Sequence, residues 1–165
     1  MLSTELAVTI GCTIVASHLD YCNSLLYGAP STSLDRLQRS QGMLARVVTQ
    51  SSSGTSARPL LQSLLWLPIR QRISHKGATL TFKARRMSAP PYLNSLLNDH
   101  VPSRTLRHSS APRLIVPRTR TELAKRAFFV AAPTLWNSLP ADVIDGNSLL
   151  SFKKYFKTHQ CAYYT

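Results

Sequence analysis

Ten prolines divide this 165-residue sequence, and only six glycines accompany them. Proline fixes φ and has no backbone N–H, so it fits the first turn of a helix but disrupts a helix interior. Short elements separated by rigid turns are therefore expected, rather than long elements joined by flexible linkers. The hydrophobic fraction of 44% is sufficient for a core, and the length fits one compact domain.

The first fifty residues predict a pair of helices. Residues 4–27 have helical character, and the Gly-Ala-Pro sequence at 28–30 ends that stretch. Small polar residues at 51–56 predict a loop, so residues 1–50 form an N-terminal helical pair. The apolar stripe of the second helix recurs at helical spacing and consists of Leu34, Leu37, Gln41, Leu44 and Val48.

Residues 57–97 predict a basic helical segment. A short helix is expected over 57–65, and Pro68 fits the first turn of a longer helix that runs to about Met87. Gly77 lies inside that longer helix and should weaken it by about 1 kcal/mol relative to Ala. The apolar side of the longer helix consists of Ile69, Ile73, Leu80, Ala84 and Met87.

Residues 98–126 predict a basic loop with a short strand or extended arm at 114–116, where apolar residues stand between two prolines. Residues 127–165 predict a C-terminal helical segment, with a kink or break at Pro133. We therefore expect a mainly α fold, a small helical domain with one or two short extended or β segments. The side chains expected in its core are Leu34, Leu37, Leu44, Val48, Trp66, Trp136, Phe152 and Phe156.

Positive charge strongly restricts the partners of this chain: 20 Lys and Arg face 7 Asp and Glu, for a net charge of +13. Nucleic acid is the usual partner of such a surface, because clustered cations neutralise phosphates and release counterions. An anionic membrane surface is the competing partner, and a solvated face of a larger protein is the third interpretation. The candidate nucleic-acid-binding residues are Arg70, Arg72, Lys76, Lys83, Arg85, Arg86, Arg104, Arg107, Arg113, Arg118 and Arg120.

The sequence lacks the residue patterns of common active sites. Phosphate-binding loops need several glycines at fixed offsets, and two-metal polymerisation needs paired carboxylates, whereas Asp142 and Asp145 fit a turn. His18 and Cys22 would share a helix face, but two ligands do not make a zinc site. We therefore expect no catalytic residue, no cofactor, no metal and no small-molecule substrate.

Phe128, Phe129 and Trp136 are the aromatic residues closest to the basic loop. Aromatic rings can stack on nucleic-acid bases. Their neighbours at 130–135 are mostly apolar, which favours core packing for all three rings.

Cysteine usage and the apolar run at 6–16 bear on the compartment. Three cysteines, Cys12, Cys22 and Cys161, are a poor disulfide framework and favour an intracellular protein. The run is far shorter than the roughly 20 residues of a membrane span. It also lacks the preceding positive charge of a signal peptide, so a buried helix is expected. The oligomeric state is left open.

Seven ordered blocks of sequence resemble a known family. They are residues 17–28 (SHLDYCNSLLYG), 34–39 (LDRLQR), 64–73 (LLWLPIRQRI), 82–84 (FKA), 89–93 (APPYL), 126–140 with its AAPTLWNSLP motif, and 151–159 (SFKKYFKTH). In this order they are similar to the C-terminal region of LINE-type, jockey-like non-LTR retrotransposon reverse transcriptase polyproteins. That region lies beyond the polymerase palm, on the thumb side.

The resemblance implies a supporting role, in which the chain contacts template RNA or target DNA without catalysis. The family's catalytic Asp-Asp motif lies upstream of this region and is absent from this sequence. The sequence departs from the family where small or polar residues occupy 74–79 and where Arg85 replaces a common Leu. The alternatives are a decayed retrotransposon-derived open reading frame with no selected function, or a helical protein-interaction module.

Overall fold

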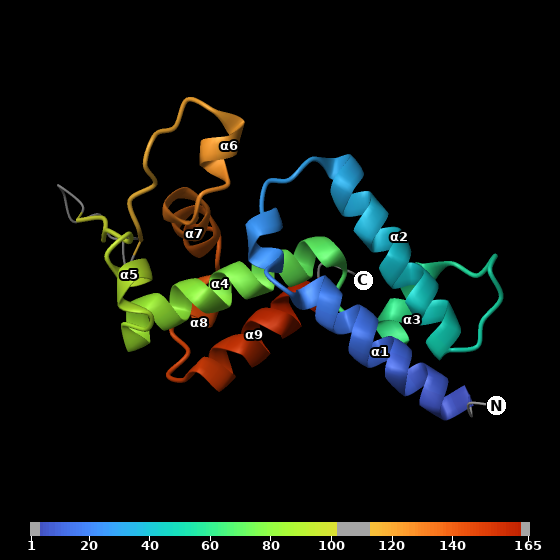
Figure 1. Ribbon diagram of the computed structural model, residues 1–165. Helices are drawn as coiled ribbons and strands as arrows, with labels where there is room; N and C mark the ends of the chain where they lie inside the picture. Colours follow the sequence, from blue (N-terminus) through green and yellow to red (C-terminus); the bar gives the residue numbers. More distant parts are fainter. Residues whose placement is uncertain (1–3, 102–112, 163–165) are drawn as a thin grey trace. The chain divides into compact units, whose positions relative to one another are not determined.

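The structure is a computed structural model that describes residues 4–101 and 113–162 (Figure 1). It confirms the mainly α fold, because helices dominate the described residues and β pairing among them is limited to one bridge, Asp99–Leu114. Internal contacts divide the chain into unit 1 (Met1–Ile73) and unit 2 (Ser74–Thr165). The division falls inside helix α4 (Ile69–Met87).

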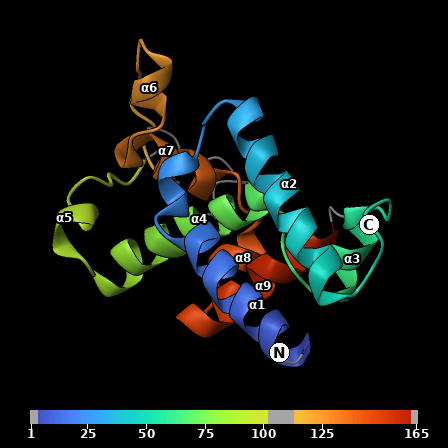
Figure 2. The same cartoon turned by 45° about the vertical axis from the view of Figure 1, so that its right-hand side comes forward.

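Unit 1 is built on two antiparallel helices. Its elements before α4 are α1 (Thr4–Asp20), the 3-10 helix η1 (Asn23–Leu26), α2 (Ser31–Val48) and α3 (Ala57–Ser63). A Cβ on Gly11 would lie 3.5 Å from Leu44 of α2, whereas Leu19, near the other end of α1, packs in the cluster that contains Leu34. The two helices therefore run in opposite directions, as Figures 1 and 2 show.

Helix α1 differs from the sequence-based expectation in two respects. It ends at Asp20, because Cys22 takes a left-handed conformation with φ of 49° before η1 begins. It is also not buried on all sides: Leu6, Ile10 and Ile14 are 49%, 41% and 52% exposed. These three residues recur every fourth position and so share one face of the helix. The expectation of a buried helix is therefore wrong for this face.

A pair of glutamines joins α2 to the turn before α4. The Gln41 side chain is completely buried, and its Nε2 donates to the Leu67 carbonyl at 2.9 Å. Gln38 accepts from the Ile69 N–H at 2.9 Å and donates to Gln41 Oε1 at 3.0 Å. A buried amide is tolerated when its donors and acceptors have partners. This network explains why Gln41 stands on an otherwise apolar stripe.

Unit 2 has an aromatic core. After α4 its helices are α5 (Pro91–Asn94), α6 (Glu122–Lys125), α7 (Phe128–Asn137), α8 (Ala141–Ile144) and α9 (Leu149–Ala162). The ring of Phe152 lies 4.6 Å from that of Phe82 and 6.2 Å from that of Trp136, between centroids. His75 stacks on Phe156 at 5.5 Å. Because His75 meets Phe156 and Phe82 meets Phe152, α4 and α9 run in opposite directions.

Small residues let α4 approach its neighbours closely. Ala78, Thr81 and Ala84 are completely buried. A Cβ on Gly77 would lie 2.7 Å from Leu135 Cδ1 of α7. Larger side chains at these positions would force neighbouring side chains to move, since a close-packed core has few voids. The small residues of this stretch are therefore part of the packing.

The expected core is mostly found. Leu34, Leu44, Trp136, Phe152 and Phe156 are buried, whereas Leu37, Val48 and Trp66 are only half-buried. Of the kink or break expected at Pro133, the break is wrong, because helix α7 continues through this residue. Pro133 removes one helical hydrogen bond and its ring crowds the carbonyl four residues earlier, but the buried residues on both sides of it keep the helix packed in unit 2.

Candidate nucleic-acid interface

Two candidate arginines in unit 1 are paired with carboxylates. Arg72 donates through Nε and Nη2 to the two oxygens of Asp20, at 2.9 and 2.5 Å, and its side chain is 17% exposed. Arg70 donates to Asp35 at 3.2 Å, and both of these side chains are more than half exposed. A guanidinium held by a carboxylate has less to gain from a phosphate. Arg72 is therefore a poor phosphate ligand, and Arg70 is a weaker one than the sequence suggests.

Arg85 in unit 2 is also engaged within the fold. Its guanidinium donates to the Asp99 carboxylate and lies over the Trp136 ring, with Cζ 5.1 Å from the ring centroid. Only 16% of the Arg85 side chain is exposed. A cation over an indole face gains electrostatic energy from the ring quadrupole. Arg85 therefore contributes to the packing of unit 2 rather than to a surface for phosphates.

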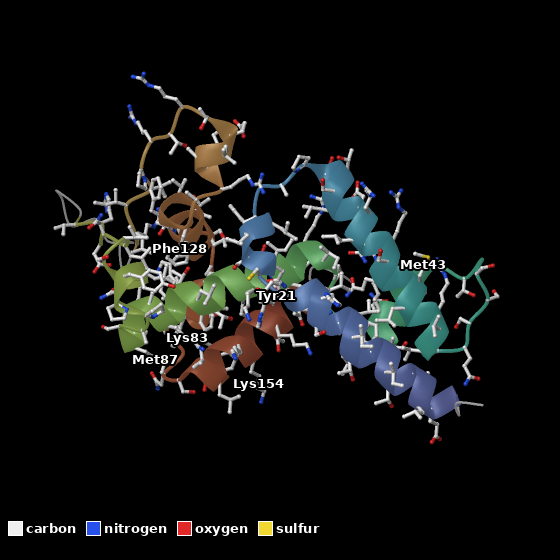
Figure 3. All side chains as sticks on the ribbon, in the orientation of Figure 1. Tyr21, Met43, Lys83, Met87, Phe128 and Lys154 are labelled. Atoms are coloured by element: carbon white, nitrogen blue, oxygen red, sulfur yellow. The ribbon has the colours of Figure 1, made fainter. Side chains whose placement is uncertain are left out.

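The other candidate cations of α4 lack such partners. The run from 70 to 86 contains no Asp or Glu. Its three paired arginines instead bind carboxylates that lie 14 to 52 residues away in sequence. Lys76 and Arg86 are exposed, and Lys83, labelled on α4 in Figure 3, is half-buried. In the described part of the chain, none of these three makes an ion pair.

The segment 113–120 contains a row of exposed arginines. Arg113, Arg118 and Arg120 are exposed, whereas Pro117 and Thr119 between them are half-buried. This alternation turns Arg118 and Arg120 outward on the same side, since residues i and i+2 of an extended chain share a face. Figure 3 shows nitrogen-tipped side chains that project outward from the ribbon leading to α6. None of the three arginines has an ion pair among the described residues.

Two of the candidates, Arg104 and Arg107, lie outside the described residues.

A second group of exposed cations was not selected from the sequence. Lys153, Lys154 and Lys157 of α9 are all exposed, on the side of the helix away from the buried Phe152 and Phe156. Lys154 is labelled in Figure 3. Residues 149–162 contain no Asp or Glu. The signal that could have identified these lysines is their spacing on one side of a predicted helix without acids, which is weaker than the density of arginines elsewhere in the chain.

The three aromatic residues of α7 differ in exposure. Trp136 is completely buried, as expected, and Phe128, labelled in Figure 3, is half-buried. Phe129 is 36% exposed, so the expectation that it lies in the core is wrong. Residues 130–133 of α7 are all buried, whereas Phe129 precedes them in the first turn of the helix and reaches solvent. Phe129 is thus the ring of this group with most access to solvent.

The part of the chain that the structure describes offers neither a cluster of metal-binding side chains nor a membrane-spanning helix. Across 4–101 and 113–162, no three His, Cys, Asp or Glu side chains gather into a group that could hold a metal ion. Asp142 and Asp145 are both exposed, in α8 and directly after it. No helix within these ranges has the length and apolar character needed to cross a membrane.

Comparison of the chain with models of protein families, with curated proteins and with solved structures finds no match in any of the three.

Proposed function

We propose that this chain is a non-catalytic nucleic-acid-contacting region, of the kind that its resemblance to the C-terminal part of LINE-type reverse transcriptases implies. Its partner in this proposal is single-stranded RNA or DNA, bound through the phosphate backbone with little sequence preference. Base-edge readout needs side chains held rigidly in a groove. The cations available here stand on an extended segment and on helix surfaces, which suits backbone contact.

One observation supports the proposal above the others: unit 2 presents exposed cations that have no carboxylate partner among the described residues. The two largest groups of them stand in the segment 113–120 and on α9, and they are Arg113, Arg118, Arg120, Lys153, Lys154 and Lys157. Each cation that contacts a phosphate releases condensed counterions. Each single-strand phosphate contact therefore adds about 0.7 to the slope of log affinity against log salt concentration.

The test is a titration of the whole chain with short single-stranded RNA at several salt concentrations. If all six cations engage, the slope should be about −4. Changing Arg113, Arg118 and Arg120 to Ala should reduce the magnitude of the slope by about 2, and so should changing the three lysines of α9.

The comparison variant removes Arg36 and Arg39, two exposed arginines on α2 of unit 1 that also lack an ion pair among the described residues, and it tests whether contact is confined to unit 2, to which this proposal assigns it. This variant should keep the slope of the unmodified chain. A slope near zero for the unmodified chain would overturn the proposal. Tight binding that persists at high salt would point to base stacking, for which Phe129 is the exposed ring. Binding to anionic vesicles but not to RNA would favour a membrane surface instead.

A second candidate function, a helical protein-interaction module, is favoured by the exposed face of α1. Leu6, Ile10 and Ile14 form an apolar row on that helix, and helices of this kind dock into apolar grooves of partners. If this is the main function, replacing the three residues with Ser should leave salt-dependent RNA binding intact while abolishing association with a protein partner.

A further inference from the structure

Leu114, the second residue of the arginine segment 113–120, lies between hydrogen-bonding partners on two sides. On one side, the Ile115 N–H donates to the Asn98 carbonyl at 2.8 Å, and the His100 N–H donates to the Arg113 carbonyl at 2.9 Å. These bonds form the antiparallel bridge centred on Leu114. In a strand, the N–H and C=O groups of successive residues point to opposite sides. The polar backbone atoms of Leu114 itself therefore face away from that bridge.

Asn137, the last residue of α7, satisfies both of these atoms. The Leu114 N–H donates to Asn137 Oδ1 at 2.9 Å, and Asn137 Nδ2 donates to the Leu114 carbonyl at 2.8 Å. A side-chain amide has the same donor and acceptor as a peptide group, so Asn137 replaces a neighbouring strand. Leu114 is only 3% exposed and lies in the aromatic core cluster. Its backbone would otherwise leave two buried polar groups without partners.

The opposite side of the bridge is tied to the core by Arg85. Asp99, the residue that pairs with Leu114, accepts from the Arg85 guanidinium, which in turn lies over Trp136. Trp136 and Asn137 are adjacent residues of α7. The two sides of the bridge are thus fixed to neighbouring positions of one helix, and the bridge cannot shift without breaking one of these contacts.

The far end of the arginine segment is fixed as well. Thr121 caps α6 by accepting from the Ala124 N–H at 3.1 Å, and the Ala127 carbonyl then accepts from the N–H groups of the first turns of α7. Between Leu114 and Thr121, Pro117 fixes its own φ and keeps Val116 extended. Arg118 and Arg120 therefore stand on a short backbone whose two ends are both held.

We propose that Asn137 is a positioning residue of the nucleic-acid interface: by pairing with Leu114 it holds the start of the segment 113–120, so that the exposed Arg113, Arg118 and Arg120 are presented to solvent from a backbone held at both ends. A preformed row loses less conformational entropy on binding than a free one. This inference rests on the function proposed above.

The test uses the whole chain and two measurements. Amide hydrogen exchange at His100, Leu114 and Ile115 reports the bridge without any RNA. The salt dependence of RNA binding reports the number of phosphates engaged. The main variant is Asn137→Leu, which keeps a similar volume but removes both bonds to Leu114, and Asn137→Ala is the second. Asn147→Ala, at an exposed asparagine before α9, is the matched control.

The expected result is faster exchange at the three amides in both Asn137 variants, together with a salt slope smaller in magnitude by about 1 to 2. Adding the Arg113, Arg118 and Arg120 to Ala changes to Asn137→Leu should then reduce the slope little further, because the two sets act on the same contacts. The Asn147→Ala control should match the unmodified chain in both measurements.

Several outcomes would overturn the inference, and they can be told apart. If the variants exchange faster but keep the full salt slope, Asn137 stabilises the fold and does not position the arginines. If exchange is unchanged, the bond pair is not what holds the bridge. If the unmodified chain shows no salt-dependent binding, the proposed function fails, and the positioning role fails with it. If Asn137→Ala unfolds the chain, the comparison of Asn137→Leu with its control still decides the question.

Discussion

The two units of the chain treat their positive charge differently. Residues 1–73 contain six arginines and three acids, whereas residues 74–165 contain fourteen lysines and arginines and four acids. In unit 1, two of the three acids hold arginines of α4. Exposed cations without an ion pair among the described residues remain in both units, at Arg36 and Arg39 in unit 1 and in larger number in unit 2, on the segment 113–120 and on α9. Charge that a fold leaves uncompensated is charge that an external polyanion can neutralise.

The cores of the units differ in a parallel way. The cluster in unit 1 that contains Leu34, Ile69 and Ile73 is aliphatic, and the buried Gln41, bonded to Gln38, links α2 to the turn at Leu67. The cluster in unit 2 is built on stacked aromatic rings around Phe152. Large rings bury much area from few residues. The aromatic core thus lets short helices in unit 2 support a surface rich in like charges.

The largest effect should come from removing the central ring of unit 2. Trp136→Ala should destabilise the chain by about 3–5 kcal/mol, because it leaves a cavity in a buried cluster and removes the platform beneath Arg85. The matched change in unit 1, Trp66→Ala, should have less than half this effect, because Trp66 is only half-buried. Denaturant unfolding measures both, and equal losses would contradict the contrast between the cores.

Two buried glycines test how tightly each unit is packed. A Cβ on Gly42 would lie 2.9 Å from the Cβ of Ala57, which cannot rotate away, so Gly42→Ala should destabilise by about 1–3 kcal/mol. At Gly77 the close atom is the tip of Leu135, which can turn. The gain in helix propensity of about 1 kcal/mol should therefore offset more of the strain there. Thermal unfolding of both variants tests this order of destabilisation. A larger loss of stability in Gly77→Ala than in Gly42→Ala would contradict it.

Removing a carboxylate from unit 1 tests whether pairing decides which arginines bind phosphate. Asp35→Asn releases Arg70, whose side chain is 55% exposed. The salt slope for RNA binding should increase in magnitude by up to about 0.7, while stability should fall by no more than about 1 kcal/mol, since the pair is exposed. Asp142→Asn is the control, at an exposed acid without an ion pair among the described residues. An unchanged slope would show that Arg70 is misplaced for phosphate even when it is unpaired.

The smallest effect concerns pH. Burial raises the pKa of Tyr27 above its ordinary value of 10.0, and this side chain packs against the aliphatic cluster of unit 1. A group whose pKa is raised in the folded state contributes its full stability below the pKa of the unfolded state, and the contribution is lost as the pH rises. Unit 1 should therefore lose stability from about pH 10 upward.

Denaturant titrations across this range measure the loss. The loss of stability at high pH should be smaller in Tyr27→Phe. The control Tyr21→Phe changes a side chain that is 81% exposed, and it should lose as much stability as the unmodified chain. If Tyr27→Phe loses stability with pH as steeply as the unmodified chain, the burial of Tyr27 is not responsible.

The spacing of apolar residues along the sequence predicted the helices well, but it did not predict which residues distant in sequence contact one another. The stripes on α2 and α9 identified Leu34, Leu44, Phe152 and Phe156 as core residues, since helical spacing is visible along the chain. The positions of partners distant in sequence are not visible in that way. The carboxylate of Asp20, which holds Arg72, stands 52 residues earlier.

The same limit applies to the candidate interface. The sequence selected eleven cations by their density along the chain, but density does not distinguish Arg85, which is stacked on Trp136, from Arg86, which is exposed one residue later. Asn137 was not selected, because an asparagine at the end of a helix looks like an ordinary C-terminal residue until Leu114 is placed beside it. The role of such a residue depends on two segments that only the fold brings together.

NMR can measure directly which of the two units contacts RNA. The whole chain is titrated with short single-stranded RNA, and the backbone amide and arginine Nε–Hε signals are followed. We expect saturable shifts at Arg113, Arg118 and Arg120 of unit 2, which weaken as salt is added. Signals of Arg36 and Arg39, exposed on α2 of unit 1, should stay in place. Shifts of equal size in both groups, or no saturable shift in unit 2, would contradict the assignment of nucleic-acid contact to unit 2.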